Sequence, residues 1–247
     1  MINRDYNNEL NDNMERKYIY NFDQDVMHRF MIEAFKPFFI SGNSLELGSY
    51  KGIFTKRLTP FFEDITCVEA SSIAIEEAKN NLSSFTNIKY ITSKFEKLEV
   101  DRKYDNIILT HVLEHIDNPV ELLKKIREQW LSENGRLFIV CPNANAASRQ
   151  IAVKMGIIDN TRAVTKAEFE HGHRITYTFD TLERDVSLSG LNVVHKTGIF
   201  FKALANFQWD QLMQTDIITD EYLVGCYKLG LEHPNLCSSI FFVCEIE

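Results

Sequence analysis

Two glycines and a distant carboxylate form the pattern in this chain that points most directly to ligand chemistry. An apolar run leads into a turn that contains Gly48 and Gly52, and a second apolar run ends in Glu69. Glu69 follows Gly48 by about 20 residues, a separation typical of α/β domains that bind an adenosine. In such domains the glycines let the backbone approach the ligand, and the carboxylate accepts hydrogen bonds from the ribose hydroxyls. We therefore expect an adenosine-containing ligand.

The glycine turn differs from the dinucleotide fingerprint. Gly-x-Gly-x-x-Gly would require glycine at the position of Tyr50, which argues against a nicotinamide-dependent dehydrogenase. The turn, Glu46-x-Gly48-x-x-x-Gly52, resembles the first motif of the class I S-adenosylmethionine (SAM)-dependent methyltransferases. The resemblance implies that Gly48 and Gly52 lie at the carboxypropyl arm of SAM and that Glu46 lies near its ammonium group. The alternative for Glu46 is a strand-end glutamate that caps the next helix.

The same resemblance assigns the ribose and part of the adenine site. Glu69 would bridge the two ribose hydroxyls, with Ala70 and Ser71 along the edge of the adenine. After the third predicted strand, the segment 92–96 takes the place of the family's adenine segment, in which a backbone amide and an acidic side chain contact the base.

Within that adenine segment, Phe95 and Glu96 are the candidates for the base contact. The family more often has Asp where this chain has Lys94. The assignment of Phe95 and Glu96 therefore depends on the position of the segment in the chain, since its residue types match the family only partly.

The segment 110–119 carries the most specific match in the chain. It reads Thr-His-Val-Leu-Glu-His-Ile-Asp-Asn-Pro and is similar to the "VLEH…P" motif of ubiquinone-biosynthesis O-methyltransferases and many sugar methyltransferases. Thr110 and His111 leave the carboxyl end of the fourth predicted strand, where open α/β sheets bind their ligands. We expect both residues to line the SAM site and His111 to lie close to the transferable methyl group.

Four histidines near this motif are candidates for proton or metal chemistry. The predicted catalytic residues are His111, His115, His171 and His173. One branch of the superfamily, the small-RNA 3′-end methyltransferases, holds a divalent metal with Glu-x-x-Glu-His and a distant histidine, and here His111 replaces the first Glu. The corresponding metal ligands would be His111, Glu114, His115 and His173. Imidazoles with one carboxylate suit Mn, Fe or Zn better than Mg.

Two interpretations without a metal stay open for these residues. A neutral imidazole can accept the proton of an alcohol while the methyl group moves, which favours His111 or a lid histidine over His115. Alternatively, Glu114 caps backbone amides and His115 packs under the edge of the sheet, as in many relatives that hold no metal.

The histidines and the polar insertions favour an oxygen acceptor. SAM carries its activation in the sulfonium centre, so a hydroxyl acceptor needs only alignment and loss of its proton. Arg149, Arg174 and several aromatic residues suit a small polar molecule: a sugar, a nucleotide sugar or a phosphorylated metabolite, for example in surface-carbohydrate biosynthesis. The alternatives are a metal-dependent RNA methyltransferase and a SAM-binding protein without catalysis.

The order of elements that must position these residues predicts a doubly wound α/β fold. Apolar strand-like runs alternate with helical patterns, which favours a mostly parallel sheet covered on both faces. The resemblance implies the seven-stranded, Rossmann-like methyltransferase sheet. The predicted strands are 45–48, 65–69, 88–92, 105–110, 135–141, 191–196 and 239–245, and the main helices are 52–59, 73–82, 118–130 and 177–188.

The rest of the chain is predicted to surround this sheet within one domain, residues 1–247. Residues 1–39 are expected to form an N-terminal cap whose helix ends before Pro37, with a polar stretch over 1–17. Two long connections, 143–176 and 199–237, interrupt the alternation and are expected to be lids that contact the acceptor.

Composition and charge narrow the class of partner. A net charge of −8 over 247 residues argues against a broad nucleic-acid surface. No apolar run approaches the roughly 20 residues of a membrane helix, and the start of the chain lacks a signal-peptide core. The five cysteines are scattered and several lie in apolar runs, which favours the reducing cytoplasm. We expect no membrane partner, and the sequence specifies no oligomeric state.

Overall fold

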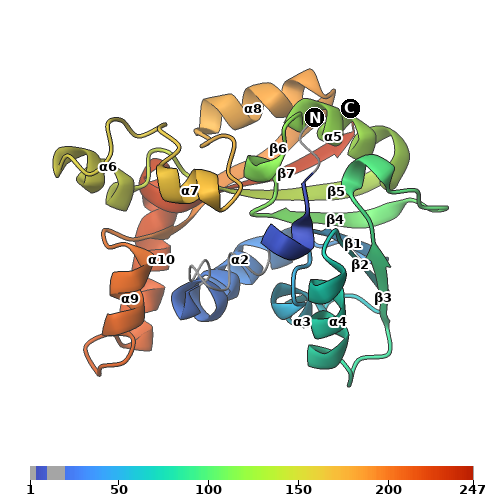
Figure 1. Cartoon of the computed structure of the whole chain (residues 1–247), viewed down its shortest axis with the longest axis horizontal. Coiled ribbons are helices and arrows are strands. Elements are labelled where there is room, and N and C mark those ends of the chain that lie inside the picture. Colours follow the sequence, from blue (N-terminus) through green and yellow to red (C-terminus); the bar gives the residue numbers. More distant parts are fainter. Residues whose placement is uncertain (1–3, 10–19, 247) are drawn as a thin grey trace.

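A seven-stranded sheet with helices on both faces forms the body of the protein (Figure 1). The computed structural model describes residues 4–9 and 20–246. The strands lie in the order β3-β2-β1-β4-β5-β7-β6. Their bounds are β1 Ser44–Leu47, β2 Ile65–Glu69, β3 Ile88–Thr92, β4 Tyr104–Thr110, β5 Leu131–Pro142, β6 Leu191–Phe201 and β7 Cys237–Ile246. The expected fold class, a doubly wound α/β fold with a mostly parallel seven-stranded sheet, is confirmed.

Strand direction determines where a ligand can bind. The strands β1 to β5 pair in parallel, and β7 is antiparallel to both β5 and β6. The carboxyl ends of β1, β2, β3, β4 and β5 therefore share one edge of the sheet, and the strand order reverses beside β1. That reversal is where doubly wound sheets open a crevice for ligands.

The helices divide between the two faces of the sheet. Figure 1 shows α5 and α8 above the sheet and α2, α3, α9 and α10 below it. The bounds on the first face are α5 Pro119–Lys125, continued by the π-helical turn η5 Ile126–Trp130, and α8 Phe179–Leu188. On the second face they are η1 Asp23–Met27, α2 His28–Phe35, η2 Lys36–Phe38, α3 Ile53–Leu58, α9 Asn206–Leu212 and α10 Asp220–Glu232. The helix α4 Ser72–Asn81 follows β2.

Alternation along the central strands builds two cores. In β5, Leu137 and Ile139 pack with α5 and α8, whereas Phe138 and Val140 pack with the N-terminal helices and α10. Because successive side chains of a strand point to opposite faces, a continuous apolar run is what a sheet covered on both faces requires. No helix in the part of the chain that the structure describes is long and apolar enough to cross a bilayer.

Several element boundaries differ from the predicted ones. The strand β6 continues to Phe201, so the second connection begins after the strand and does not begin at residue 199. Both predicted lids contain helices: α6 Ala147–Lys154 and α7 Lys166–Glu170 in the first, α9 and α10 in the second. Part of the predicted 1–39 cap lies outside the described residues, and η1 with α2 forms the described part of its helix.

Candidate functional site

A cavity of about 510 Å³ opens at the carboxyl edge of the sheet. Most of the residues expected to bind SAM or to act in catalysis line it: Glu46, Gly48, Glu69, Ala70, Ser71, Phe95, Thr110, His111, Glu114, His115, His171 and His173. Gly52 and Glu96 do not. The structure therefore brings together residues that lie up to 127 positions apart, from 46 to 173, at the carboxyl ends of β1, β2 and β4 and in the segments that follow β2 to β5.

The turn after β1 requires a glycine at position 48. Gly48 has φ of +79°, and a Cβ atom there would lie 2.5 Å from Cγ2 of Val112. Its N–H donates to the carbonyl of Val68 at 2.8 Å. A bare backbone therefore faces the cavity between the first and fourth strands.

Gly52, which is predicted to contact SAM, does not line the cavity. Gly52 precedes α3 with φ of +77°, and a Cβ atom there would meet Leu82 and Ala78 at 2.6 and 3.2 Å. The residue is small because α3 approaches α4 closely at this point.

Glu69 organises the loops around the expected ribose position. One carboxylate oxygen accepts the N–H of Tyr50 at 3.1 Å, and the other accepts the N–H of Ser71 at 2.9 Å. Burial raises the pKa of Glu69, and these backbone hydrogen bonds act in the opposite direction. A carboxylate can accept about four hydrogen bonds, so both oxygens keep acceptor capacity for two hydroxyls.

Glu46 is a buried carboxyl without a basic partner among the described residues. Its side chain is 1% exposed and accepts a hydrogen bond from Oγ1 of Thr55 at 2.6 Å. Burial raises the pKa of Glu46 to about 7. Because an ionised carboxylate at this depth is costly, the position suits a ligand that brings a cation. Among the described residues, Glu46 accepts hydrogen bonds from the side chains of Thr55 and Cys67, which does not support the alternative that it caps the backbone of the next helix.

The adenine segment is held in place by α5. Phe95 is half-buried and lines the cavity, whereas Glu96 is exposed and lies outside it. The ammonium of Lys125 donates to the carbonyls of both residues, at 2.9 and 3.0 Å. The predicted contact between the Glu96 side chain and the base therefore finds no support in the lining of the cavity and stays a prediction.

His111 has a backbone conformation that is unusual for a residue with a side chain. It follows β4 with φ of +54°, and its N–H donates to the carbonyl of Val140 at 2.8 Å. Its Nδ1 lies 3.3 Å from Oε1 of Glu114. Left-handed residues outside glycine cluster at functional sites. The bend directs the imidazole into the cavity beside the glycine turn.

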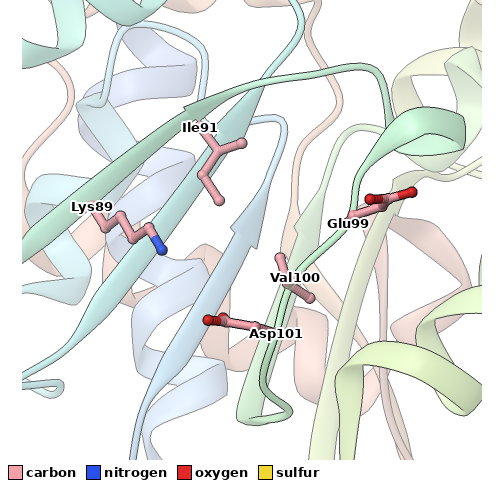
Figure 2. A pocket seen from close by; sticks show the side chains of 5 residues that line it. All are labelled: Lys89, Ile91, Glu99, Val100 and Asp101. Atoms are coloured by element: carbon pink, nitrogen blue, oxygen red, sulfur yellow. The ribbon is translucent and has the colours of Figure 1, made fainter.

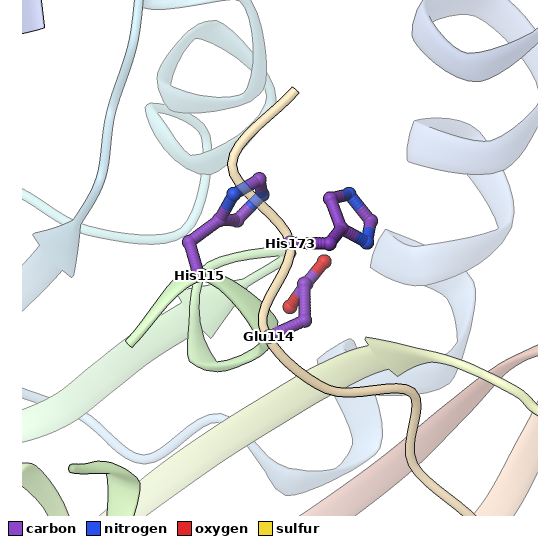
Figure 3. A group of neighbouring side chains, drawn as sticks. All are labelled: Glu114, His115 and His173. Atoms are coloured by element: carbon purple, nitrogen blue, oxygen red, sulfur yellow. The ribbon is translucent and has the colours of Figure 1, made fainter. Parts of the chain in front are cut away.

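Glu114, His115 and His173 form a compact cluster, in which the side chains converge (Figure 3). One potential ligand atom from each lies within 4.8 Å of the others. Burial lowers the pKa of His115 to about 4 and also lowers that of His173, so both imidazoles are neutral near pH 7. Glu114 is 1% exposed, and neither of its oxygens has a hydrogen bond to a described residue. His111, expected as a fourth ligand, lies outside this group.

Sequence reasoning missed the opposite wall of the cavity. Asp23, Gln24, Met27, His28 and Met31 contribute to it from η1 and α2. His28 packs edge-on against Phe54, and its Nδ1 is buried without a hydrogen-bond partner in the part of the chain that the structure describes. Burial lowers the pKa of His28 to about 3. These residues fall within an amphipathic helix, where polar side chains are usually solvated, so the sequence carried no specific signal.

Lys202, also missed, extends this wall from the end of β6. Its ammonium donates to Oδ1 of Asn206, whose amide nitrogen donates to both oxygens of Asp23 at 2.8 and 2.9 Å. Burial lowers the pKa of Lys202 to about 8 and raises that of Asp23. The sequence contains one signal for this position, because Lys202 directly follows the apolar end of β6.

The two lid arginines considered for a phosphate are already paired. Nη1 of Arg149 lies 2.6 Å from Oε1 of Glu168 and joins α6 to α7. Nε of Arg174 lies 3.2 Å from Oδ1 of Asp117. Neither side chain is therefore a free anion-binding group.

A second hollow, of about 440 Å³, lies away from this edge (Figure 2). Lys89 and Ile91 of β3 line it together with residues 99–101. It shares no residue with the larger cavity and contains none of the predicted site residues.

Sequence comparison relates the chain to known enzymes. Residues 16–196 match the family described as "Methyltransferase domain". The malonyl-[acyl-carrier protein] O-methyltransferase of Halalkalibacterium halodurans is 30% identical over 132 residues, which cover 49% of this chain and 48% of that protein. The mitochondrial ubiquinone biosynthesis O-methyltransferase of Schizosaccharomyces pombe is 26% identical over 170 residues, covering 65% and 57%. The chain spans about half the length of the curated relatives it matches.

Structural comparison gives the same fold. A SAM-dependent methyltransferase from Thermotoga maritima superposes with a TM-score of 0.65 over 98% of this chain and 99% of that chain, at 14% sequence identity. At this identity the likeness concerns the arrangement of the sheet and helices.

Proposed function

The chain belongs to the methyltransferase domain family, within the class I SAM-dependent enzymes, and on that premise we propose that it methylates an oxygen atom of a small polar acceptor. The observation that carries the proposal is the set of residues that line the cavity of about 510 Å³. Gly48 and Glu69, which are expected to bind SAM, line it together with His111, Asp23 and Lys202.

The residues on the SAM side fit the charges of that molecule. Glu46 offers a buried carboxyl to an ammonium group, Gly48 a bare backbone to the carboxypropyl arm, and Glu69 two acceptors to the ribose. SAM, when bound, supplies a methyl group on a positively charged sulfur. The protein has to align the acceptor with it and exclude water.

The residues on the acceptor side support an oxygen nucleophile. His111 projects into the cavity and is proposed to take the proton of the acceptor hydroxyl. Lys202 makes a single hydrogen bond among the described residues, so two of its N–H groups can donate to oxygens of the acceptor. The curated relatives described above are named as O-methyltransferases. A sugar, nucleotide sugar or phosphorylated metabolite is the proposed class of acceptor.

Transfer of the labelled methyl group from SAM to a panel of acceptors tests this function. The panel contains sugars, nucleotide sugars, phosphorylated metabolites, matched amines and RNA oligonucleotides. We expect label in a hydroxyl compound of low molecular mass. We expect little label in RNA, because the acidic chain repels phosphate chains. Label in RNA alone would replace the proposal with an RNA methyltransferase, and SAM binding without turnover on any acceptor would favour a non-catalytic role.

SAM affinity should depend on the ionisation of Glu46. Its carboxyl has a pKa of about 7 in the protein without ligand, and only the ionised form attracts the ammonium group of SAM. Binding then releases a proton, so calorimetry should show roughly tenfold weaker binding at about pH 6 than at about pH 8. Glu46→Gln should bind more weakly and lose this pH dependence. An unchanged pH dependence in that variant would contradict the assigned position of Glu46.

The free energy of unfolding should depend on pH in the opposite direction to SAM affinity, because ionisation of Glu46 strengthens SAM binding and destabilises the ligand-free protein. The folded pKa of Glu46 exceeds its usual value, so the stabilising contribution of the protonated form is lost as the pH rises through about 7. The ligand-free protein should therefore gain stability at alkaline pH on substitution Glu46→Gln, and unfolding experiments at acidic and alkaline pH would show the crossover.

Metal assistance is a second candidate, favoured by one observation. The buried carboxylate of Glu114 has no hydrogen bond to a described residue, and two neutral imidazoles face it (Figure 3). Glu114, His115 and His173 would hold a Mn, Fe or Zn ion, which would act as a Lewis acid on the acceptor oxygen.

Removal of metal decides between the two forms of assistance. If the cluster binds a functional ion, elemental analysis should find about one equivalent, and exhaustive chelation should abolish activity until Mn²⁺, Fe²⁺ or Zn²⁺ is restored. Glu114→Gln should lower the metal content, whereas Glu121→Gln, an exposed change on α5, should not. Full activity in metal-free protein would exclude metal assistance and would leave proton abstraction by a histidine as the remaining mechanism.

A further inference from the structure

Residues 4–9, which belong to the predicted polar stretch 1–17, lie across the cavity. Arg4, Tyr6 and Glu9 contribute to its lining. Residues 6–9 form a short helix that lies beside α4 and is drawn in dark blue in Figure 1. We call residues 4–9 the strap.

The strap connects the loops that follow three strands. After β2, Asn7 contacts Ser71 and Ser72: Ser71 Oγ donates to its Oδ1 at 2.8 Å, and its Nδ2 donates to Ser72 Oγ at 3.1 Å. After β3, Lys94 donates to the carbonyl of Arg4 at 3.0 Å. After β4, Nη1 of Arg4 donates to the carbonyl of His115 at 2.9 Å.

The strap is also tied together internally. Arg4 forms two hydrogen bonds to Glu9, at 2.8 and 2.7 Å, and its side chain is 12% exposed. The ring of Tyr6 lies between two cations, with the Arg4 guanidinium 4.8 Å and the Lys94 ammonium 5.1 Å from its centroid. A paired Arg and two cation–π contacts give the segment a defined conformation.

One residue links the strap to the expected ribose site. The N–H of Ser71 donates to Glu69, while its hydroxyl donates to Asn7. Lys94, which holds Arg4, lies in the adenine segment beside Phe95. The strap therefore covers the end of the cavity assigned to the adenosine of SAM, away from the acceptor wall formed by Asp23 and Lys202.

Resting on the function proposed above, we propose that the strap is a part of the SAM-binding site that retains SAM and its product S-adenosylhomocysteine through Tyr6 and the contacts of Arg4 and Asn7. It supplies one wall of the adenosine end, so loss of its anchors should accelerate dissociation. Contacts formed at the end of binding affect the dissociation rate more than the association rate.

The test measures the rates of S-adenosylhomocysteine binding to the full chain. Radiolabelled S-adenosylhomocysteine is bound, then chased with excess unlabelled compound, and association is followed separately. Asn7→Ala and Arg4→Met should each raise the dissociation rate about tenfold and change the association rate less than about twofold. Asn8→Ala is the matched control, because Asn8 is exposed and, among residues 4–9 and 20–246, its side chain bonds only to Asp5 of the strap.

Three results would overturn the proposal. Dissociation from Asn7→Ala and Arg4→Met could equal that of the wild type, or Asn8→Ala could accelerate it as much as they do. Association and dissociation could also rise together at constant affinity, which would make the strap a barrier without binding contacts. Thermal unfolding without ligand shows whether each variant is folded. Failure of the wild type to bind S-adenosylhomocysteine would instead remove the proposed function itself.

Discussion

Substitution of His111 by Asn should lower the rate of methyl transfer by about a hundredfold or more, the usual effect of losing a general base. SAM affinity should change much less, since the charged and backbone groups assigned to SAM belong to Glu46, Gly48 and Glu69. Asn is the suitable replacement because it tolerates the left-handed conformation of position 111, where φ is +54°, and cannot accept a proton as imidazole does.

The measurement is single-turnover transfer from labelled SAM to the acceptor found in the panel. His233→Asn provides the control, because His233 is exposed beyond α10 and does not line the cavity. A His111→Asn protein with the wild-type rate and unaltered SAM affinity would exclude His111 as the base and direct attention to Lys202 or His28.

Substitution of Glu69 by Ala should weaken SAM binding by about 1–3 kcal/mol, or roughly 5- to 150-fold, through loss of charge-assisted bonds to the ribose. The structure adds a second cause. The N–H groups of Tyr50 and Ser71 would lose their acceptor, which loosens the turn after β1 and the loop after β2. Calorimetry with SAM measures the combined effect.

Glu69→Gln separates the two causes, because its amide keeps one acceptor for these backbone groups while removing the charge. Glu76→Ala, on the exposed face of α4, controls for net charge. Equal SAM affinity in Glu69→Ala and the wild type would contradict the ribose assignment. In that case the Glu69 carboxylate would only stabilise the turn after β1 and the loop after β2.

The part of the site that sequence could predict depends on short-range pattern combined with topology. Gly48 and Glu69 follow apolar strands, and parallel strands bring their carboxyl ends to one edge. The position of His111 follows from the same rule applied to β4. These inferences needed no knowledge of side-chain packing.

The remaining residues depend on contacts between distant segments. Asp23 and Lys202 meet through Asn206, across more than half of the chain, and neither neighbourhood carries a motif. Gly52 shows the converse limitation. Gly52 lies in a recognised turn and is predicted to contact the ligand, but its neighbours are Ala78 of α4 and Leu82, which follows α4. Spacing alone does not distinguish a glycine that faces a ligand from one that faces a helix.

The predicted set of metal ligands also differs from the observed cluster because spacing in the sequence does not determine where side chains lie. Nδ1 of His111 lies 3.3 Å from Oε1 of Glu114, yet the group of mutually close ligand atoms contains Glu114, His115 and His173 without His111. Glu114 and His115 belong to the short 3₁₀ turn Leu113–His115, which His111 precedes in a left-handed conformation.

The place of β7 in the sheet has a consequence for synthesis of the protein on the ribosome. Within the described chain β6 pairs with β7 alone, and β7 also pairs with β5. While residues 237–246 are still inside the exit tunnel, β6 and the helices that pack on it have no strand to join them to the emerging sheet. The first five strands can associate as they emerge, but the wall of the cavity that contains Lys202 can form only after β7 has emerged and paired with β6. Such non-local pairing is slow to form, so the acceptor side of the cavity should be the last part of the nascent protein to become native.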